Sequence, residues 1–255
     1  MTGVQTCALP ICRLAGIREV IGYATKKRGI LLSKKIAPFA PDGQHRIDYY
    51  LHILEQAGLK VKDRHPEFFF GPEDLAQAEQ FLAQQSVKKG DMLIGINAGG
   101  NWGLKRWPKE NWAALADSLT DNLGAKVVIT GSQKDIALAE GIRGLVNHGL
   151  IIAAGKLSLK AFAALCRRLD LFISADTGPL HIANAAGAKN IIALFGPTVP
   201  GITGPRPMQG VQIVQKDTGC KVPCYEVACP YNRCMRAITV EDVLARARAV
   251  KQILP

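Results

Sequence analysis

The 255-residue sequence lacks any apolar run that approaches the roughly 18 to 20 residues needed to cross a bilayer. It also lacks an RGG run, an aromatic RNP-like motif and a Cys/His finger, which are typical of nucleic-acid-binding proteins. Its seven cysteines are too few for a secreted disulfide scaffold. We therefore expect a cytoplasmic protein with reduced thiols and no nucleic-acid partner.

Apolar residues and positive charge are plentiful. Hydrophobic residues make up 48% of the chain, which is enough to form a sizeable core in one large domain or two ordinary ones. The formal net charge of +11 is spread along the chain, so it predicts a basic surface and not a basic tail. Such a surface attracts nucleic acids, anionic lipid headgroups or phosphorylated substrates, and composition alone does not choose between them.

The first third of the sequence is less regular than the rest. Residues 1–12 show neither helical nor strand periodicity and resemble translated sequencing-adaptor sequence, so we expect a non-native tail. Residues 13–88 contain apolar runs at 20–23 and 29–33 that predict strands, and helical patterns at 46–56 and 75–85. A complete doubly wound domain needs more strands, so this segment predicts the closing part of a larger domain whose earlier part is missing.

Residues 89–238 alternate regularly between strand and helix. Short β-branched apolar runs predict strands at 92–96, 126–130, 150–153, 171–173, 190–194 and 211–214. The stretches between them have helical spacing, with one apolar face at 112–123 and another at 159–169. Continuous apolar strands joined by helices indicate an α/β fold with a parallel sheet covered on both faces. Residues 239–255 predict a final helix.

Three polar loops follow strands of this predicted sheet, at the edge where ligands bind in such folds. They are 97–108, 131–133 and the turn 174–181, in which Gly178 and Pro179 suit the start of a helix and its anion-binding N–H groups. No P-loop and no GxGxxG fingerprint is present. Considered alone, the turn is equally well explained as an ordinary strand-to-helix connection, and Lys105 as a solvated surface lysine.

Four thiols fall within fifteen positions near the end of the chain. Such density suits zinc or an iron–sulfur cluster, but the spacing lacks the paired C-x2-C of common zinc sites. Reduced packing thiols or a disulfide explain the loop better, and we expect no metal site and no cofactor. The residues are Cys220, Cys224, Cys229 and Cys234.

A series of motifs, in order, resembles glycosyltransferase family 9, the lipopolysaccharide heptosyltransferases, from about Leu14 to the C-terminus. The motifs are Gly-Leu-Lys-Arg-Trp-Pro at 103–108, Ala-Asp-Thr-Gly-Pro-Leu-His-Ile-Ala at 175–183, Leu-Phe-Gly-Pro-Thr at 194–198 and Thr-Gly-Pro at 203–205.

The resemblance implies a GT-B fold, in which two Rossmann-like domains face each other. Residues 89–238 would be the complete C-terminal domain that binds the nucleotide-sugar donor, and 13–88 the remnant of the acceptor-side domain. The helix 239–255 would return to the N-terminal domain. The resemblance also implies an inverting, metal-independent transferase that moves heptose from ADP-heptose to the lipopolysaccharide inner core. Such an enzyme would act at the cytoplasmic face of the inner membrane and associate with it peripherally.

The resemblance assigns roles at the three loops. Lys105 would stabilise the leaving diphosphate, while Asp176, which a diphosphate repels, would bind a sugar hydroxyl or order the turn. His181 would donate to phosphate, unless it is a packed first-turn histidine that bonds the backbone. The donor-binding residues implied are Asn97, Lys105, Ser132, Gln133, Asp176, Thr177, Gly178, Pro179, Leu180 and His181.

The sequence departs from the family at the general base, an acidic residue expected early in the N-terminal domain. Asp42, Asp48 and Asp63 do not match its pattern, so the base is unassigned and we expect sugar transfer to be poor or absent. Two alternatives remain open: a family 9 transferase that uses another nucleotide sugar, and a noncatalytic module that binds nucleotides or polyanions.

Overall fold

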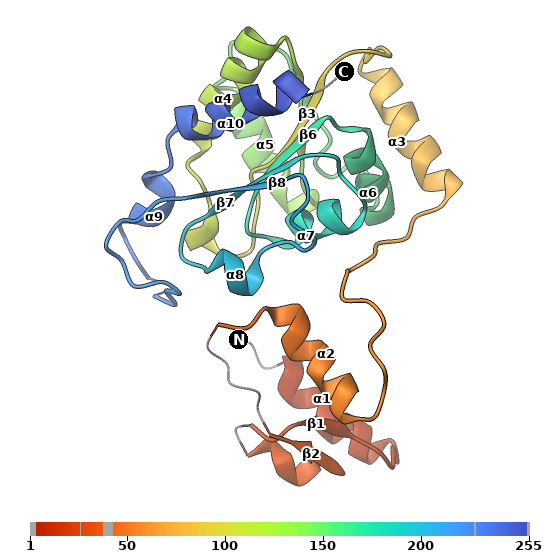
Figure 1. The fold of residues 1–255 in the computed structure, drawn as a ribbon. Helices are drawn as coiled ribbons and strands as arrows, with labels where there is room; N and C mark the ends of the chain where they lie inside the picture. The colour runs from red at the N-terminus through yellow and green to blue at the C-terminus, as the bar shows by residue number, and fades with distance from the viewer. Residues whose placement is uncertain (1–3, 26, 38–42, 227, 254–255) are drawn as a thin grey trace. The chain divides into compact units, whose positions relative to one another are not determined.

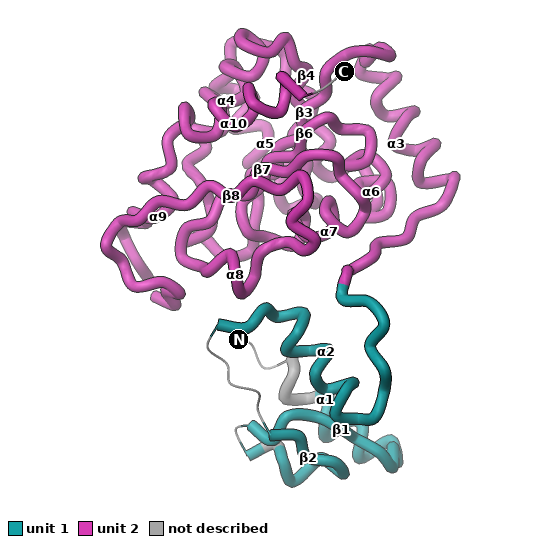
Figure 2. The backbone as a smooth tube through the Cα atoms, viewed as in Figure 1, with its two compact units in different colours: residues 1–64 teal, residues 65–255 magenta. Residues whose placement is uncertain are grey.

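A computed structural model describes residues 4–25, 27–37, 43–226 and 228–253. The chain divides into two compact units, unit 1 (residues 1–64) and unit 2 (residues 65–255), which Figure 2 colours separately. This division precedes the expected domain boundary at residue 88. The reason is helix α3 (Pro72–Gln84), which packs against α6 (Leu159–Arg168) of unit 2 and buries Ala78, Phe81 and Leu82 in its core.

Unit 1 contains α1 (Val4–Leu14), the two parallel strands β1 (Ile21–Tyr23) and β2 (Lys34–Ile36), a 3-10 turn η1 (Arg28–Leu31) and α2 (Arg46–Gln56). The strand expected at 29–33 is wrong: η1 covers most of it, Ile30 is 81% exposed, and Leu32 is the buried apolar side chain of this run. Residues 4–12, expected to have no regular structure, lie in α1, where Ala8 and Leu9 are good helix formers.

Unit 2 is built on a six-stranded parallel sheet with the order β5-β4-β3-β6-β7-β8. Five of the strands begin or end one or two residues from their predicted limits, and β4 matches its prediction. The strand order reverses direction between β3 and β6, as in a doubly wound sheet. The strands are β3 (Leu93–Asn97), β4 (Lys126–Thr130), β5 (Leu150–Ile152), β6 (Leu171–Ala175), β7 (Ile191–Phe195) and β8 (Val211–Gln215).

Helices cover both faces of this sheet, as predicted (Figure 1). On one face α4 (Lys109–Leu123), α5 (Ile136–Arg143) and α10 (Val240–Ile253) pack around Trp112. On the other, α3, α6 and α7 (Gly178–Ala185) pack around Phe172. Of the expected apolar face 159–169, Ala163, Cys166 and Leu169 are buried, Phe162 is partly buried, and Leu159 is 59% exposed.

The final helix, α10, packs against α4, β7 and β8 within unit 2. Its buried side chains are Val243, Leu244, Ala247 and Val250. Its expected return to the N-terminal domain stays a prediction. Among the described residues, no helix is both long and apolar enough to cross a membrane.

Candidate functional site

The three polar loops meet, because they leave neighbouring strands at the same edge of the sheet. Asn97, the last residue of β3, pairs in register with Thr130 at the end of β4 and with Ser174 near the end of β6. The side chain of Asn97 is buried, and its Nδ2 donates to the carbonyl oxygen and hydroxyl of Thr130, both at 3.3 Å. Asn97 therefore links the end of β3 to the end of β4 through side-chain hydrogen bonds.

A cavity of about 620 Å³ opens at this edge, between the loops that follow β3, β4 and β6. Six of the predicted donor-binding residues line it: Asn97, Ser132, Gln133, Thr177, Gly178 and Pro179. One end of the lining is apolar and comes from the segment around α6. The remaining lining residues are Gly99, Gly100, Asn101, Arg106, Gly131, Lys134, Asp135, Gly155, Leu157, Ser158, Leu159, Phe162 and Ile182.

Glycines let the loops around the cavity lie against each other. A Cβ added to Gly99 would overlap the carboxylate of Asp135, and one added to Gly100 would come 2.9 Å from Cγ2 of Thr177. Asp135 is held in place as expected for a capping box, since its Oδ2 accepts from the Ser132 N–H at 2.8 Å and hydroxyl at 2.7 Å. The shape of the cavity thus depends on backbone that carries no side chain.

Helix α7 begins at the cavity wall. Thr177 occupies its N-cap position, but its hydroxyl lies 3.3 Å from the Ala175 carbonyl and makes no cap bond. The first-turn N–H groups of α7 are thus not taken up by this side chain, as an anion site requires. Leu180 does not line the cavity: its side chain is fully buried in the core, and its N–H donates to the Thr177 carbonyl, so its expected role in donor binding stays a prediction.

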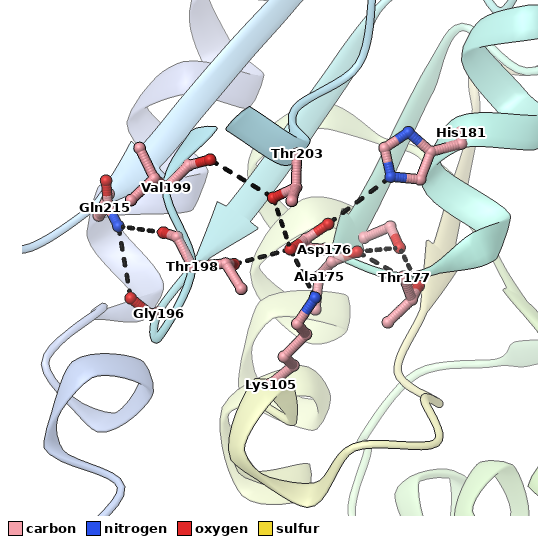
Figure 3. A network of polar contacts seen from close by, with 11 residues as sticks. Lys105, Ala175, Asp176, Thr177, His181, Gly196, Thr198, Val199, Thr203 and Gln215 are labelled. Carbon is pink, nitrogen blue, oxygen red and sulfur yellow. Dashed lines mark hydrogen bonds and ion pairs between the residues drawn. The ribbon is translucent and has the colours of Figure 1, made fainter. Parts of the chain in front are cut away.

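Asp176 lies beside this cavity at the centre of a separate polar cluster, shown in Figure 3. Its Oδ2 accepts from Lys105 Nζ at 2.6 Å, from the Thr198 hydroxyl at 2.7 Å and from the Thr203 hydroxyl at 3.2 Å. Its Oδ1 lies 3.6 Å from Nε2 of His181. We call these five residues the Asp176 cluster. The loop after β7, which carries Thr198 and the Leu-Phe-Gly-Pro-Thr motif, therefore reaches this cluster.

The cluster keeps Asp176 ionised. Burial by itself would raise the pKa of this carboxyl, but the donors from His181, Lys105 and Thr198 lower it from 3.8 to about 2. The charge of Asp176 is balanced by Lys105, whose side chain is 18% exposed. His181 is 44% exposed and faces Asp176 (Figure 3), so it is not the packed histidine of the alternative interpretation.

The loop that carries Lys105 is anchored by the next tryptophan. Trp107 is buried edge-on against Trp112, and its Nε1 donates to the Ile238 carbonyl at 2.9 Å. Lys105 Nζ also lies 5.4 Å from the centre of the Trp102 ring. Lys105 does not line the cavity; its neighbour Arg106 does, which sequence reasoning missed.

The four cysteines line a second, smaller cavity of about 250 Å³, together with Leu104 and Pro197. All four are free thiols, and burial raises the pKa of Cys234. The Cys224 N–H donates to the Pro197 carbonyl at 2.8 Å, next to Thr198. Within the described ranges, no three His, Cys, Asp or Glu side chains are placed to hold a metal ion. The four-cysteine loop is thus bonded to the loop after β7 that also carries Thr198.

The acidic residues considered for the base lie in unit 1 or outside the described residues. Asp48 pairs with Arg64 at 3.1 Å, and Arg64 also pairs with Glu55. Asp42 falls outside the described residues, and Asp63 lies just before the end of unit 1. We therefore assign none of the three as the base.

Comparisons with known proteins agree with the geometry. The lipooligosaccharide heptosyltransferase 2 of Campylobacter jejuni is 27% identical over 208 residues, which cover 79% of this chain and 63% of that protein. The crystal structure of the family 9 glycosyltransferase from Veillonella parvula superposes with a TM-score of 0.76 at 27% identity, over 87% of this chain and 63% of that one. This chain thus spans a little under two thirds of the length of these relatives.

A third comparison concerns the fold. E. coli ADP-heptose LPS heptosyltransferase II matches with a TM-score of 0.75 at 22% identity, over 96% of this chain and 73% of that chain.

A sequence model of glycosyltransferase family 9 (heptosyltransferase) matches residues 3–234, and so begins within the stretch expected to be a non-native tail. This match over most of the chain shows that the protein belongs to glycosyltransferase family 9, and the match with heptosyltransferase II shows that it has the α/β fold of the GT-B heptosyltransferases.

Proposed function

We propose that unit 2 binds the nucleotide-sugar donor ADP-heptose in the 620 Å³ cavity, as part of an inverting heptosyltransferase that acts on the lipopolysaccharide inner core. The observation that carries this proposal is the position of the cavity, at the carboxyl edge of a doubly wound sheet and against the start of α7. Membership of family 9 and the heptosyltransferase names of the relatives support the choice of donor.

The proposed chemistry depends on stabilising the leaving diphosphate. Negative charge grows on it as the glycosidic bond breaks, and N–H groups at the start of α7 together with a lysine lower the energy of that state where water is excluded. Lys105 gives one of its three N–H donors to Asp176, which leaves two for a phosphate oxygen. No step in this scheme requires a metal or a cofactor.

Asp176 has two proposed roles, one for each carboxylate oxygen. Its Oδ2 accepts three hydrogen bonds and so orders Lys105 and the loop after β7. Among the described residues, its Oδ1 has only the longer contact with His181, so it remains able to accept from a sugar hydroxyl. This combines the two roles expected from the sequence. His181, next to it and partly exposed, is proposed to donate to the phosphate or the sugar.

For the acceptor side we propose only the rate of transfer and the place where it occurs. The described residues of unit 1 contain two short strands, and no carboxylate there is assigned as the base, so we expect the 255-residue polypeptide to bind donor but transfer heptose slowly. Because the acceptor is a membrane lipid and the net charge is +11, we propose peripheral association with the cytoplasmic face of the inner membrane. Turnover comparable to that of a full-length relative would contradict the expected slow transfer.

Thermal unfolding with a panel of donors tests the proposal, because only a ligand that binds the folded state raises the midpoint. We expect ADP-heptose and ADP to raise it, and UDP-glucose and GDP-mannose to leave it unchanged. A rise with UDP-glucose or GDP-mannose alone would favour another nucleotide sugar. Salt-dependent DNA binding without any nucleotide effect would favour the noncatalytic polyanion-binding module.

A further inference from the structure

The Asp176 cluster offers little net positive charge to a bound diphosphate, because its lysine is paired with a carboxylate. Lys105 Nζ and Asp176 Oδ2 lie 2.6 Å apart, and both side chains are largely buried. The pair carries no net charge, so a phosphate placed beside it meets a lysine that is already compensated. A nucleoside diphosphate carries at least two negative charges at neutral pH, and its binding therefore calls for another cation at the cavity wall.

Arg106 is such a cation. It lines the cavity, it is exposed, and no carboxylate of the described residues forms an ion pair with it. Its guanidinium is nevertheless fixed in place, because Nε and Nη2 donate to the Gly100 carbonyl at 2.8 and 2.6 Å. Holding this oxygen with one edge leaves the Nη1 hydrogens and one Nη2 hydrogen for a ligand.

The fixed position of Arg106 is close to the start of α7. Gly100, which holds the guanidinium, packs so tightly on Thr177 that no Cβ fits between them. Thr177 in turn is the N-cap residue of α7. The backbone anchor of Arg106 is thus one contact away from the N–H groups proposed to bind the diphosphate.

We propose that Arg106 is a preorganised cation that contacts the diphosphate of the donor, an inference that rests on the proposed function of the cavity. Lys105 then serves the reaction centre from within the Asp176 cluster, and Arg106 supplies the uncompensated charge for binding. A guanidinium suits this role, since its planar fork binds a backbone carbonyl on one side and phosphate oxygens on the other.

Lys134 provides a matched control. It also lines the cavity and is exposed, but no hydrogen bond to another group fixes it among the described residues. Replacing either residue by glutamine removes one positive charge from the same cavity. If only the total positive charge of the cavity matters, the two variants should lose equal ADP affinity. If Arg106 makes a preorganised contact, only its replacement should weaken ADP binding.

The test is calorimetric titration of the 255-residue chain and of the variants Arg106→Gln, Arg106→Lys and Lys134→Gln with ADP and with adenosine. For ADP we expect about tenfold weaker binding with Arg106→Gln, a smaller loss with Arg106→Lys and less than about threefold with Lys134→Gln. Adenosine affinity should be the same in all four proteins, because it lacks the phosphates.

The outcomes separate this inference from the proposed function. If the unmodified chain does not bind ADP, the proposed function fails and this inference fails with it. If the chain binds ADP and Arg106→Gln binds it equally well, or if Lys134→Gln loses as much as Arg106→Gln, only the role of Arg106 is overturned. Loss of adenosine binding in Arg106→Gln would likewise overturn it, since it would show damage to the cavity itself.

Discussion

The Asp176 cluster and the 620 Å³ cavity lie at the same edge of the same sheet but are built in opposite ways. In the cluster, a buried carboxylate accepts hydrogen bonds from three side chains, lies 3.6 Å from His181, and has its charge balanced by Lys105. The cavity instead opens to solvent, has several glycines in its lining, and carries Arg106 and Lys134, which form no ion pair within the described part of the chain. We infer that the two have different roles: the Asp176 cluster fixes the loops in place, and the cavity binds the nucleotide-sugar donor.

The largest expected effect is on the stability of the cluster. Asp176→Asn leaves the largely buried ammonium of Lys105 without its counter-charge, so we expect the free energy of unfolding at pH 7 to fall by about 3 kcal/mol. Urea unfolding measures it. Asp242→Asn is the control, because Asp242 has a similarly lowered pKa of about 2 but pairs with Lys216 at the surface. We expect it to lose less than about 1 kcal/mol. Equal losses would contradict the distinction.

The pH dependence of stability sharpens the same point. The pKa of Asp176 is about 2 when folded and near 3.8 when unfolded, so the unfolded chain takes up the proton first as the pH falls. The contribution of Asp176 is complete above the unfolded value and is lost as the pH falls through the folded one. Between pH 5 and pH 2 the stability advantage over Asp176→Asn should shrink by about 2 kcal/mol. An advantage that does not change with pH would show that Asp176 is not held as an ion.

A change in the cavity should affect binding more than stability. Gly99→Ala would push its methyl group against the Asp135 carboxylate and displace the loop after β4, so we expect ADP to bind about fivefold more weakly. Gly103→Ala lies in the same loop but meets no atom within 4 Å, and should bind ADP normally. Titration calorimetry checks both variants. Normal binding by Gly99→Ala would argue against a ligand at these glycines.

The smallest expected effect concerns the four-cysteine loop. Cys224→Ser should leave the metal content of the purified protein and its ADP affinity unchanged, because no three suitable side chains of the described residues are placed to hold a metal ion. Elemental analysis of both proteins measures the first and calorimetry the second. One equivalent of zinc or iron in the unmodified protein, lost in the variant, would contradict this expectation.

Much of the fold could be predicted from sequence, because a parallel strand that is buried on both faces of its sheet has an unbroken run of apolar residues. All six strands of unit 2 were found in this way, and strand order then brings the loops of Asn97, Ser132 and Asp176 together. Shorter and half-exposed segments were less clear. The run at 29–33 is apolar but not a strand, because Ile30 faces solvent.

The partition of charge within the site could not be predicted. Lys105 and Arg106 are neighbours in sequence and equally basic, and only the path of the backbone after Gly100 directs one to Asp176 and the other to the cavity. Leu180 is part of the same motif as Asp176, yet the helical turn between them carries it into the core. Periodicity and motif spacing contain no information on such directions.

Titration of the 255-residue chain with ADP-heptose, followed by displacement with ADP, tests the central claim most directly. If the cavity of unit 2 is a nucleotide-sugar site, the chain binds one equivalent of ADP-heptose saturably, and ADP displaces it from the same site. A chain that circular dichroism shows to be folded, but that binds neither compound saturably, would contradict the account.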